Sequence, residues 1–122
     1  MGKLQVLIAE DSALLAAELR ELIGSLPGFS IVGIVPSTAD VRDLLRRRPV
    51  DVLILDVLLQ DGSSLSLLEE GVATRCRTIL MTAQPSESLR TRVLRLGAVS
   101  LLDKAEGFDA LLSWLHGLAP AP

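Results

Sequence analysis

Short apolar runs alternate with longer amphipathic segments along the chain. The runs predict five strands, at Leu4–Ala9, Ser30–Val35, Val52–Leu55, Thr78–Met81 and Ala98–Leu102. Each run contains β-branched residues, which favour the pleated conformation of a strand. The first, third and fourth runs are apolar rather than alternating, which is typical of parallel strands covered by helices on both faces.

The segments between the strands predict helices, because their apolar residues recur at spacings of three and four. In the first segment Ser12 is the predicted N-cap, and Leu15, Leu19, Leu22 and Leu26 share one helical face. Further helices are predicted from Ser37 or Thr38 to Pro49, from about Ser64 to Glu70, from Ser86 to Leu96 and from near Glu106 onward. The fold class is therefore α/β, with five strand–helix units forming an open parallel sheet between two helical layers.

Length and composition fit one folded domain. With 122 residues, of which 49% are hydrophobic, the chain is long enough for one compact core. We expect this domain to span residues 1–118, and residues 119–122, Ala-Pro-Ala-Pro, to form an unstructured tail. Aromatic residues make up only 2% and tyrosine is absent, which argues against a stacking platform for nucleic-acid bases or sugars.

Charge and cysteine content narrow the function classes further. The 12 Lys and Arg residues against 15 Asp and Glu residues give a net charge of −3, so no positive field attracts nucleic acid or an anionic membrane. No apolar stretch approaches the roughly 20 residues of a membrane helix. The lone Cys76 has no metal-ligand spacing around it, which predicts a reduced, cytoplasmic protein.

Polar residues gather where the predicted strands end. Glu10 and Asp11 follow the first strand, Asp56 follows the third, Thr82 the fourth and Lys104 the fifth. The carboxyl ends of parallel strands share one edge of the sheet, which is where doubly wound sheets bind their ligands. If the first and third strands are neighbours, the three carboxylates converge at that edge.

The three carboxylates would repel one another unless a hard divalent cation neutralised them, and Mg²⁺ fits this ligand set best. Mg²⁺ held by few carboxylates keeps coordination positions for phosphate oxygens. The ammonium of Lys104 and the hydroxyl of Thr82 also suit the oxygens of a phosphoryl group. Lys104 is unusual in this chain, because only Lys3 and Lys104 among the 12 cationic residues are lysines. The constellation therefore indicates Mg²⁺-dependent phosphoryl transfer.

Together these residues resemble the receiver domain of two-component response regulators. The resemblance lies in Glu10-Asp11, in Asp56 with the following segment 57–62, in Thr82-Ala83, and in Gly97-Ala98 leading to Lys104. It covers residues 4 to about 118 of the chain. It implies a flavodoxin-like, doubly wound sheet with the strand order 2-1-3-4-5.

The resemblance also implies a role for each residue. Asp56 would be the phosphoacceptor, receiving its phosphoryl group from a sensor histidine kinase or a phosphotransfer protein. Mg²⁺ would be bound by Asp11, Asp56 and the backbone carbonyl of Leu58, with Glu10 acting through water. Thr82-Ala83 and Lys104 would contact the phosphoryl group, and Thr82 would move on activation. The surface of helix four, strand five and helix five would then switch for partner binding.

Three positions, Gln60, Leu101 and Ala105, depart from the commonest receiver pattern, and Gln60 stands where the family often has proline. Leu101 stands three residues before Lys104, where many receivers carry Tyr or Phe, so an aromatic switch cannot operate here. Ala105, in place of the common proline, and Pro27-Gly28-Phe29 are similar to receivers of the helix-turn-helix DNA-binding subfamily. The chain is therefore interpreted as a stand-alone receiver or, alternatively, as the excised or truncated receiver of a DNA-binding transcription regulator.

Several of these residues also have a plain structural interpretation. Glu10 and Asp11 alone would fit the N-terminal dipole of the next helix, and Thr82 alone would fit a hydroxyl bonded to backbone. Their register with Asp56 and Lys104 favours the site instead. His116 is interpreted as a solvated helix residue and Cys76 as an incidental thiol.

Helices four and five carry a candidate partner surface. Trp114 and Leu118, beside Arg90, Arg92 and Arg95, would form a patch for a downstream protein target or for a phosphorylation-dependent homodimer. An equal alternative is that Trp114 lies flat over the edge of the core.

We interpret the chain as a phosphorylation-controlled switch and not as an enzyme, apart from Mg²⁺-dependent phosphorylation and dephosphorylation of its own Asp56. An aspartate-nucleophile phosphatase would need an acid two residues after the nucleophile, where Leu58 stands. A flavin- or nucleotide-binding module would need a phosphate-cradling loop after the first strand, where Glu10 and Asp11 stand. We expect this domain to contact neither nucleic acid nor membrane directly.

Overall fold

Five parallel strands form a single sheet in the order β2-β1-β3-β6-β7. The computed structural model describes residues 2–118. The strands of this sheet are β1 (Leu4–Ala9), β2 (Phe29–Val35), β3 (Val52–Asp56), β6 (Arg77–Thr82) and β7 (Ser100–Asp103). The predicted fold class and strand order are thus confirmed, and the predicted tail, residues 119–122, lies outside the described residues.

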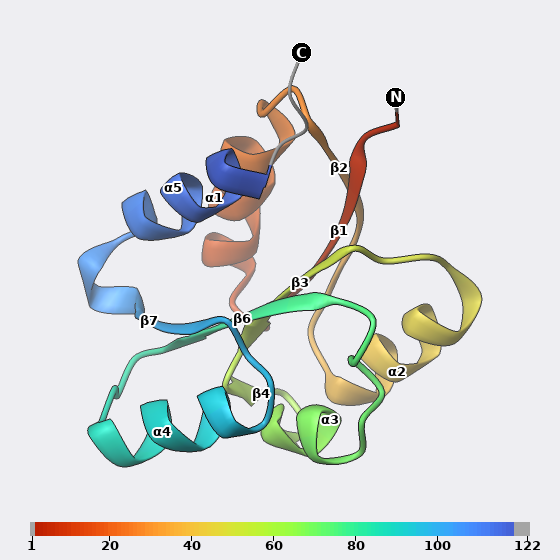
Figure 1. Ribbon diagram of the computed structural model, residues 1–122. Coiled ribbons are helices and arrows are strands. Elements are labelled where there is room, and N and C mark those ends of the chain that lie inside the picture. The colour runs from red at the N-terminus through yellow and green to blue at the C-terminus, as the bar shows by residue number, and fades with distance from the viewer. Residues whose placement is uncertain (1, 119–122) are drawn as a thin grey trace.

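Helices cover both faces of the sheet (Figure 1). One layer contains α1 (Ala13–Gly24) and α5 (Asp109–Leu118), and the other contains α2 (Thr38–Arg47), α3 (Leu65–Glu69) and α4 (Glu87–Arg95). Leu19 and Leu111 belong to the core cluster of the first layer, whereas Leu44 and Val93 belong to that of the second. The apolar strands β1, β3 and β6 contribute side chains to both clusters, which explains why their sequences do not alternate.

Serine side chains begin three of the helices. Ser12, Ser37 and Ser86 accept hydrogen bonds from the backbone N–H groups of Leu15 at 3.3 Å, Asp40 at 3.1 Å and Leu89 at 3.1 Å, respectively. Each bond satisfies a backbone donor that the helix itself leaves unpaired. The helix starts predicted from these serines are therefore confirmed.

The structure differs from the sequence prediction at several places. The strand predicted at Ala98–Leu102 begins instead at Ser100 and ends at Asp103. A small antiparallel hairpin, β4 (Leu58–Leu59) and β5 (Gly62–Ser63), follows β3. The first helix ends at Gly24, not at Leu26. The last helix begins at Asp109, because residues Lys104–Glu106 form a 3₁₀ turn that Asp103 caps by accepting a 2.9 Å hydrogen bond from the Ala105 N–H.

Strand register brings the polar strand ends together. Ala9, the last residue of β1, pairs with Leu55, so the next residues, Glu10 and Asp56, emerge side by side. Thr82 at the end of β6 pairs with Asp103, the residue before Lys104. Within residues 2–118, the structure contains no helix with the length and apolar character needed to cross a membrane.

Candidate functional site

Three carboxylates from two neighbouring strands meet at the carboxyl edge of the sheet. Oxygen atoms of Glu10, Asp11 and Asp56 all lie within 4.8 Å of one another. Glu10 and Asp56 are buried, whereas Asp11 is exposed to solvent. Several carboxylate oxygens on one open side are the donor set that Mg²⁺ takes in proteins, so the residues present fit this cation.

Lys104 lies between the two buried carboxylates. Its Nζ is 2.8 Å from Oε1 of Glu10 and 2.8 Å from Oδ2 of Asp56. The lysine side chain is 14% exposed and that of Glu10 is fully buried. Glu10 is also fixed by its other oxygen, Oε2, which accepts a 3.0 Å hydrogen bond from the backbone N–H of Ser12.

Burial and charge act against each other in this cluster. Burial raises the pKa of Asp56 above its usual value, a hydrogen bond from Lys104 opposes the rise, and the charge of Glu10 adds to it. Burial alone would lower the pKa of Lys104, but its hydrogen bonds and charge interactions with Asp56 and Glu10 raise that pKa above its usual value. One ammonium cannot neutralise three carboxylates, so the site retains negative charge that a divalent cation would offset.

A cleft of about 520 Å³ opens beside Asp56. Its lining contains the predicted residues Asp11, Asp56, Leu58, Thr82, Ala83 and Lys104. The buried Thr82 accepts a 3.1 Å hydrogen bond from the Gln84 N–H through Oγ1, which leaves its own hydroxyl proton free to donate to a ligand. The cleft therefore places a hydroxyl donor and an ammonium beside the Asp56 carboxylate.

Leu101 is buried in β7 and belongs to the same core cluster as Leu80 and Val93. Its backbone carbonyl accepts a 3.1 Å hydrogen bond from Nη1 of Arg90 on α4. Sequence reasoning placed Arg90 in a partner surface and missed this contact, because the acceptor is a backbone atom on another element. Arg90 thus connects α4 to the strand that leads to Lys104.

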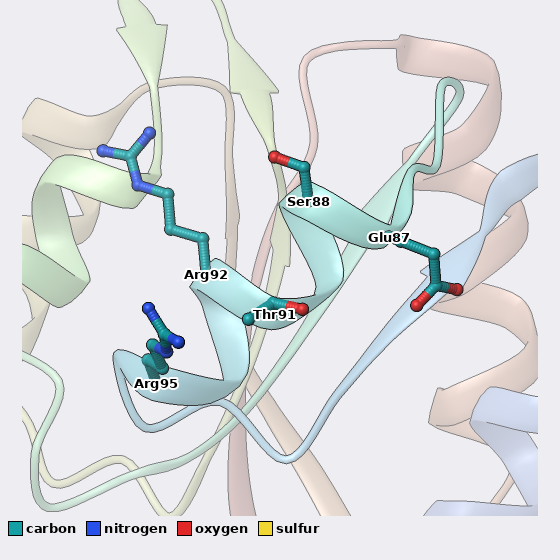
Figure 2. Close-up of a pocket in the computed structure, with 5 residues that line it drawn as sticks. All are labelled: Glu87, Ser88, Thr91, Arg92 and Arg95. Atoms are coloured by element: carbon teal, nitrogen blue, oxygen red, sulfur yellow. The ribbon is translucent and has the colours of Figure 1, made fainter.

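The candidate partner surface is divided between two layers of the fold. Figure 2 shows Arg92 and Arg95 on neighbouring turns of α4, where they line a hollow of about 490 Å³ with Glu87, Ser88 and Thr91. Arg92 forms a 2.6 Å ion pair with Glu69 of α3. Trp114 and Leu118 are half-buried on α5, where they pack against the core cluster of the opposite face. The structure therefore does not place Arg92 against Trp114, and a partner patch containing both stays a prediction.

Cys76 and His116 lie outside this cluster. The Cys76 thiol donates a 3.4 Å hydrogen bond to the Val50 carbonyl. Burial, followed by the charge of Asp51, raises the pKa of this thiol, which disfavours a reactive thiolate. His116 is exposed on α5.

A family model described as the response regulator receiver domain matches residues 6–116 of the chain. Among solved structures, the chain resembles the CheX–CheY complex with BeF3 and Mg²⁺ from Borrelia burgdorferi, with a TM-score of 0.83, 20% identity, and coverage of 94% of this chain and 88% of that chain. It also resembles the receiver domain of the Francisella response regulator 1452, with a TM-score of 0.82, 20% identity, and coverage of 95% and 96%. Likeness at this level of identity shows the shared fold.

Curated relatives are more similar in sequence. The chain is 35% identical over 105 residues to a protein-glutamate methylesterase/protein-glutamine glutaminase of Thiobacillus denitrificans, a match that covers 84% of this chain and 30% of the relative. It is 33% identical over 115 residues to a protein of the same name in Pseudomonas aeruginosa, with coverage of 88% and 33%. The chain thus spans about a third of the length of these curated relatives.

These relatives overturn one prediction. From its sequence, the chain is predicted not to be an enzyme, apart from the modification of Asp56. The curated relatives bear the name of an enzyme that acts on protein glutamate and glutamine side chains, although the match covers only their receiver-like third. The prediction was wrong because the composition and motifs of a receiver carry no information on what is joined to it.

Proposed function

The chain belongs to the response regulator receiver domain family of two-component signalling, and from this premise we propose that Asp56 accepts a phosphoryl group from a sensor histidine kinase or phosphotransfer protein. The observation that carries the proposal is the Lys104 ammonium, 2.8 Å from Oδ2 of Asp56 in a cleft lined also by Asp11 and Thr82. A carboxylate that was only structural would not need a half-buried cation and an open cleft on the same side.

Asp56 is the nucleophile of the proposed transfer. One of its carboxylate oxygens attacks phosphorus while the bond from phosphorus to the donor's imidazole nitrogen breaks, and that nitrogen keeps the electron pair. Lys104 and the Thr82 hydroxyl offset negative charge on the phosphoryl oxygens. The fixed positions of Glu10 and Lys104 orient Asp56 before the donor arrives.

Mg²⁺ would be held by Asp11, Asp56 and the backbone carbonyl of Leu58, with Glu10 acting through water. When bound, it supplies positive charge to the phosphoryl oxygens and to the carboxylates. The raised pKa of Asp56 supports this assignment, because the buried carboxylate is short of compensating charge.

Phosphorylation with a small donor tests the proposal. In acetyl phosphate and Mg²⁺, the wild-type chain should gain one phosphoryl group, detected by intact-mass spectrometry, and Asp56→Asn should gain none. Chelation of the metal should abolish labelling of the wild type. The matched control is Asp40→Asn, which changes an exposed aspartate in the first turn of α2 and should label like the wild type. Equal labelling of the wild type and Asp56→Asn would refute the assignment.

We further propose that the output of this receiver is control of a methylesterase/glutaminase effector, in place of the DNA-binding output considered from the sequence. The relatives at 35% identity support this output, whereas the structure of a LuxR-family response regulator is only 15% identical and supports the fold alone. Recombinant effector domain from the Thiobacillus denitrificans relative should change its esterase rate when this chain is added in its phosphorylated form. An unchanged rate with both forms would count against this output.

A further inference from the structure

The residues after Asp56 are anchored to a distant helix by one side chain. Asp61 lies in the two-residue turn of the β4–β5 hairpin, between Leu59 and Gly62. Its Oδ1 accepts a 2.8 Å hydrogen bond from the Thr38 N–H, and its Oδ2 accepts a 2.8 Å bond from the Thr38 hydroxyl and a 3.1 Å bond from the Ala39 N–H. The carboxylate thus bridges this hairpin and the first turn of α2, across 22 to 23 positions of sequence.

A second contact beside Asp61 holds the same turn. The Gln60 N–H donates a 3.0 Å hydrogen bond to the Pro36 carbonyl, at the junction of β2 and α2. The hairpin begins at Leu58, two residues after Asp56, so its backbone is fixed by Asp56 at one end and by α2 at the other. Short, doubly fixed segments hold their carbonyl groups in one orientation more firmly than free loops do.

The segment from Leu58 to Glu70 contains the β4–β5 hairpin and α3. Its C-terminal end is also connected to α2, through Arg42. Arg42 of α2 donates to Glu70 through Nε at 2.8 Å and Nη2 at 2.6 Å, and to the Thr38 hydroxyl oxygen through Nη1 at 3.0 Å. A polar chain therefore runs from Asp61 through Thr38 and Arg42 to Glu70, just after α3. Asp61 secures the Leu58 end of this segment, and Glu70 secures the end that lies farther from Asp56.

We propose that Asp61 is a positioning residue for the Mg²⁺ site: it anchors the β4–β5 hairpin to α2 and so sets the Leu58 carbonyl relative to Asp56. The inference rests on the proposed function. The purely structural alternative is that Asp61 only caps α2, where Ser37 already takes the Asp40 N–H and Asp61 takes the two preceding ones. A cap changes stability, whereas a positioning residue changes metal affinity.

Matched amide substitutions separate these roles. In Asp61→Asn the amide replaces one acceptor oxygen with an NH2 donor, which cannot accept from a backbone N–H, so one oxygen is left for the N–H groups of Thr38 and Ala39 that two oxygens pair with in the wild type. Glu70→Gln makes the same chemical change at the other end of the polar chain. Both variants should unfold at lower urea concentration than the wild type. Only Asp61→Asn should raise the Mg²⁺ dissociation constant, measured by titration calorimetry, by about tenfold, as outer-sphere changes at metal sites do.

Kinetics provide the second measurement. With acetyl phosphate, Asp61→Asn should need more Mg²⁺ for half-maximal labelling but approach the wild-type rate at saturating Mg²⁺. An unchanged Mg²⁺ dissociation constant in Asp61→Asn, or an equal rise in both variants, would overturn the positioning role. Failure of the wild type itself to label on Asp56 would instead contradict the proposed function, so the two failures are distinguishable.

Discussion

Lys104 is shared by two buried carboxylates, and this sharing sets the energetics of the site. Glu10, Asp56 and Lys104 carry a net charge of −1 when all are ionised, and Asp11 adds another negative charge nearby. A compact ammonium can approach two carboxylates at 2.8 Å each from one side, which the planar guanidinium of arginine does less readily. Uncompensated charge at a buried position costs folding free energy, so the cluster lowers the stability of the fold.

The raised pKa of Asp56 predicts how stability depends on pH. Because the folded pKa lies above the ordinary 3.8, the folded chain holds this proton more tightly than the unfolded chain. This contribution to stability is therefore fully present below pH 3.8 and is lost as pH rises through the folded pKa. In chelator, Asp56→Asn should accordingly be more stable than the wild type at neutral pH, because the amide carries no charge to bury.

Urea denaturation over a pH series measures this difference. The advantage of Asp56→Asn should shrink as the pH is lowered through the folded pKa, because the wild-type carboxyl then becomes protonated. Asp40→Asn should show no comparable advantage, because Asp40 is exposed. An Asp56→Asn variant that is less stable than the wild type at neutral pH would contradict the prediction. Added Mg²⁺ should reduce the advantage by stabilising the ionised carboxylate.

Among the helices and strands, the sequence predicts those features that depend on a local pattern of residues. The strands and the helix starts at Ser12, Ser37 and Ser86 follow from apolar runs and N-cap residues, which act within a few positions. The β4–β5 hairpin escaped prediction because each of its strands has only two residues, too few for a periodic pattern. The 3₁₀ turn after β7 escaped because Asp103 caps it through the N–H of Ala105, a contact that hydrophobic spacing does not reveal.

The same distinction between local pattern and tertiary contact applies to the candidate site. Glu10, Asp11, Asp56, Thr82 and Lys104 could be predicted to meet because each stands where a strand ends, and parallel strands end at one edge. The contacts of Asp61 with α2 and of Arg90 with β7 could not be predicted from sequence. Apart from the Thr38 hydroxyl, their partners are backbone groups of Thr38, Ala39 and Leu101, and almost any residue supplies such groups. Pairing of this kind is determined by the tertiary arrangement of elements and leaves no residue-specific signal.

The proposed phosphoryl transfer requires a donor protein to dock on the whole molecule around the cleft beside Asp56. Two exposed leucines stand close in sequence to the site residues: Leu14 is 79% exposed, three residues after Asp11, and Leu58, which lines the cleft, is 68% exposed, two residues after Asp56. Single exposed leucines are common on protein surfaces, but leucines next to site residues provide apolar contact for a partner. A small donor such as acetyl phosphate needs no such contact.

A substitution at Leu14 should therefore affect phosphoryl transfer from a histidine kinase but not from acetyl phosphate. Leu14→Glu should slow transfer from a phosphorylated histidine kinase that labels the wild-type chain by about tenfold, the effect of losing a single good interface side chain. Labelling by acetyl phosphate should stay at the wild-type rate, because Leu14 does not line the cleft beside Asp56. Leu94→Glu, at a 46% exposed leucine on α4, is the matched control and should keep both rates. Equal slowing with both donors would mean that the new charge disturbs the acidic site itself. Unchanged rates with both donors would place the docking surface elsewhere.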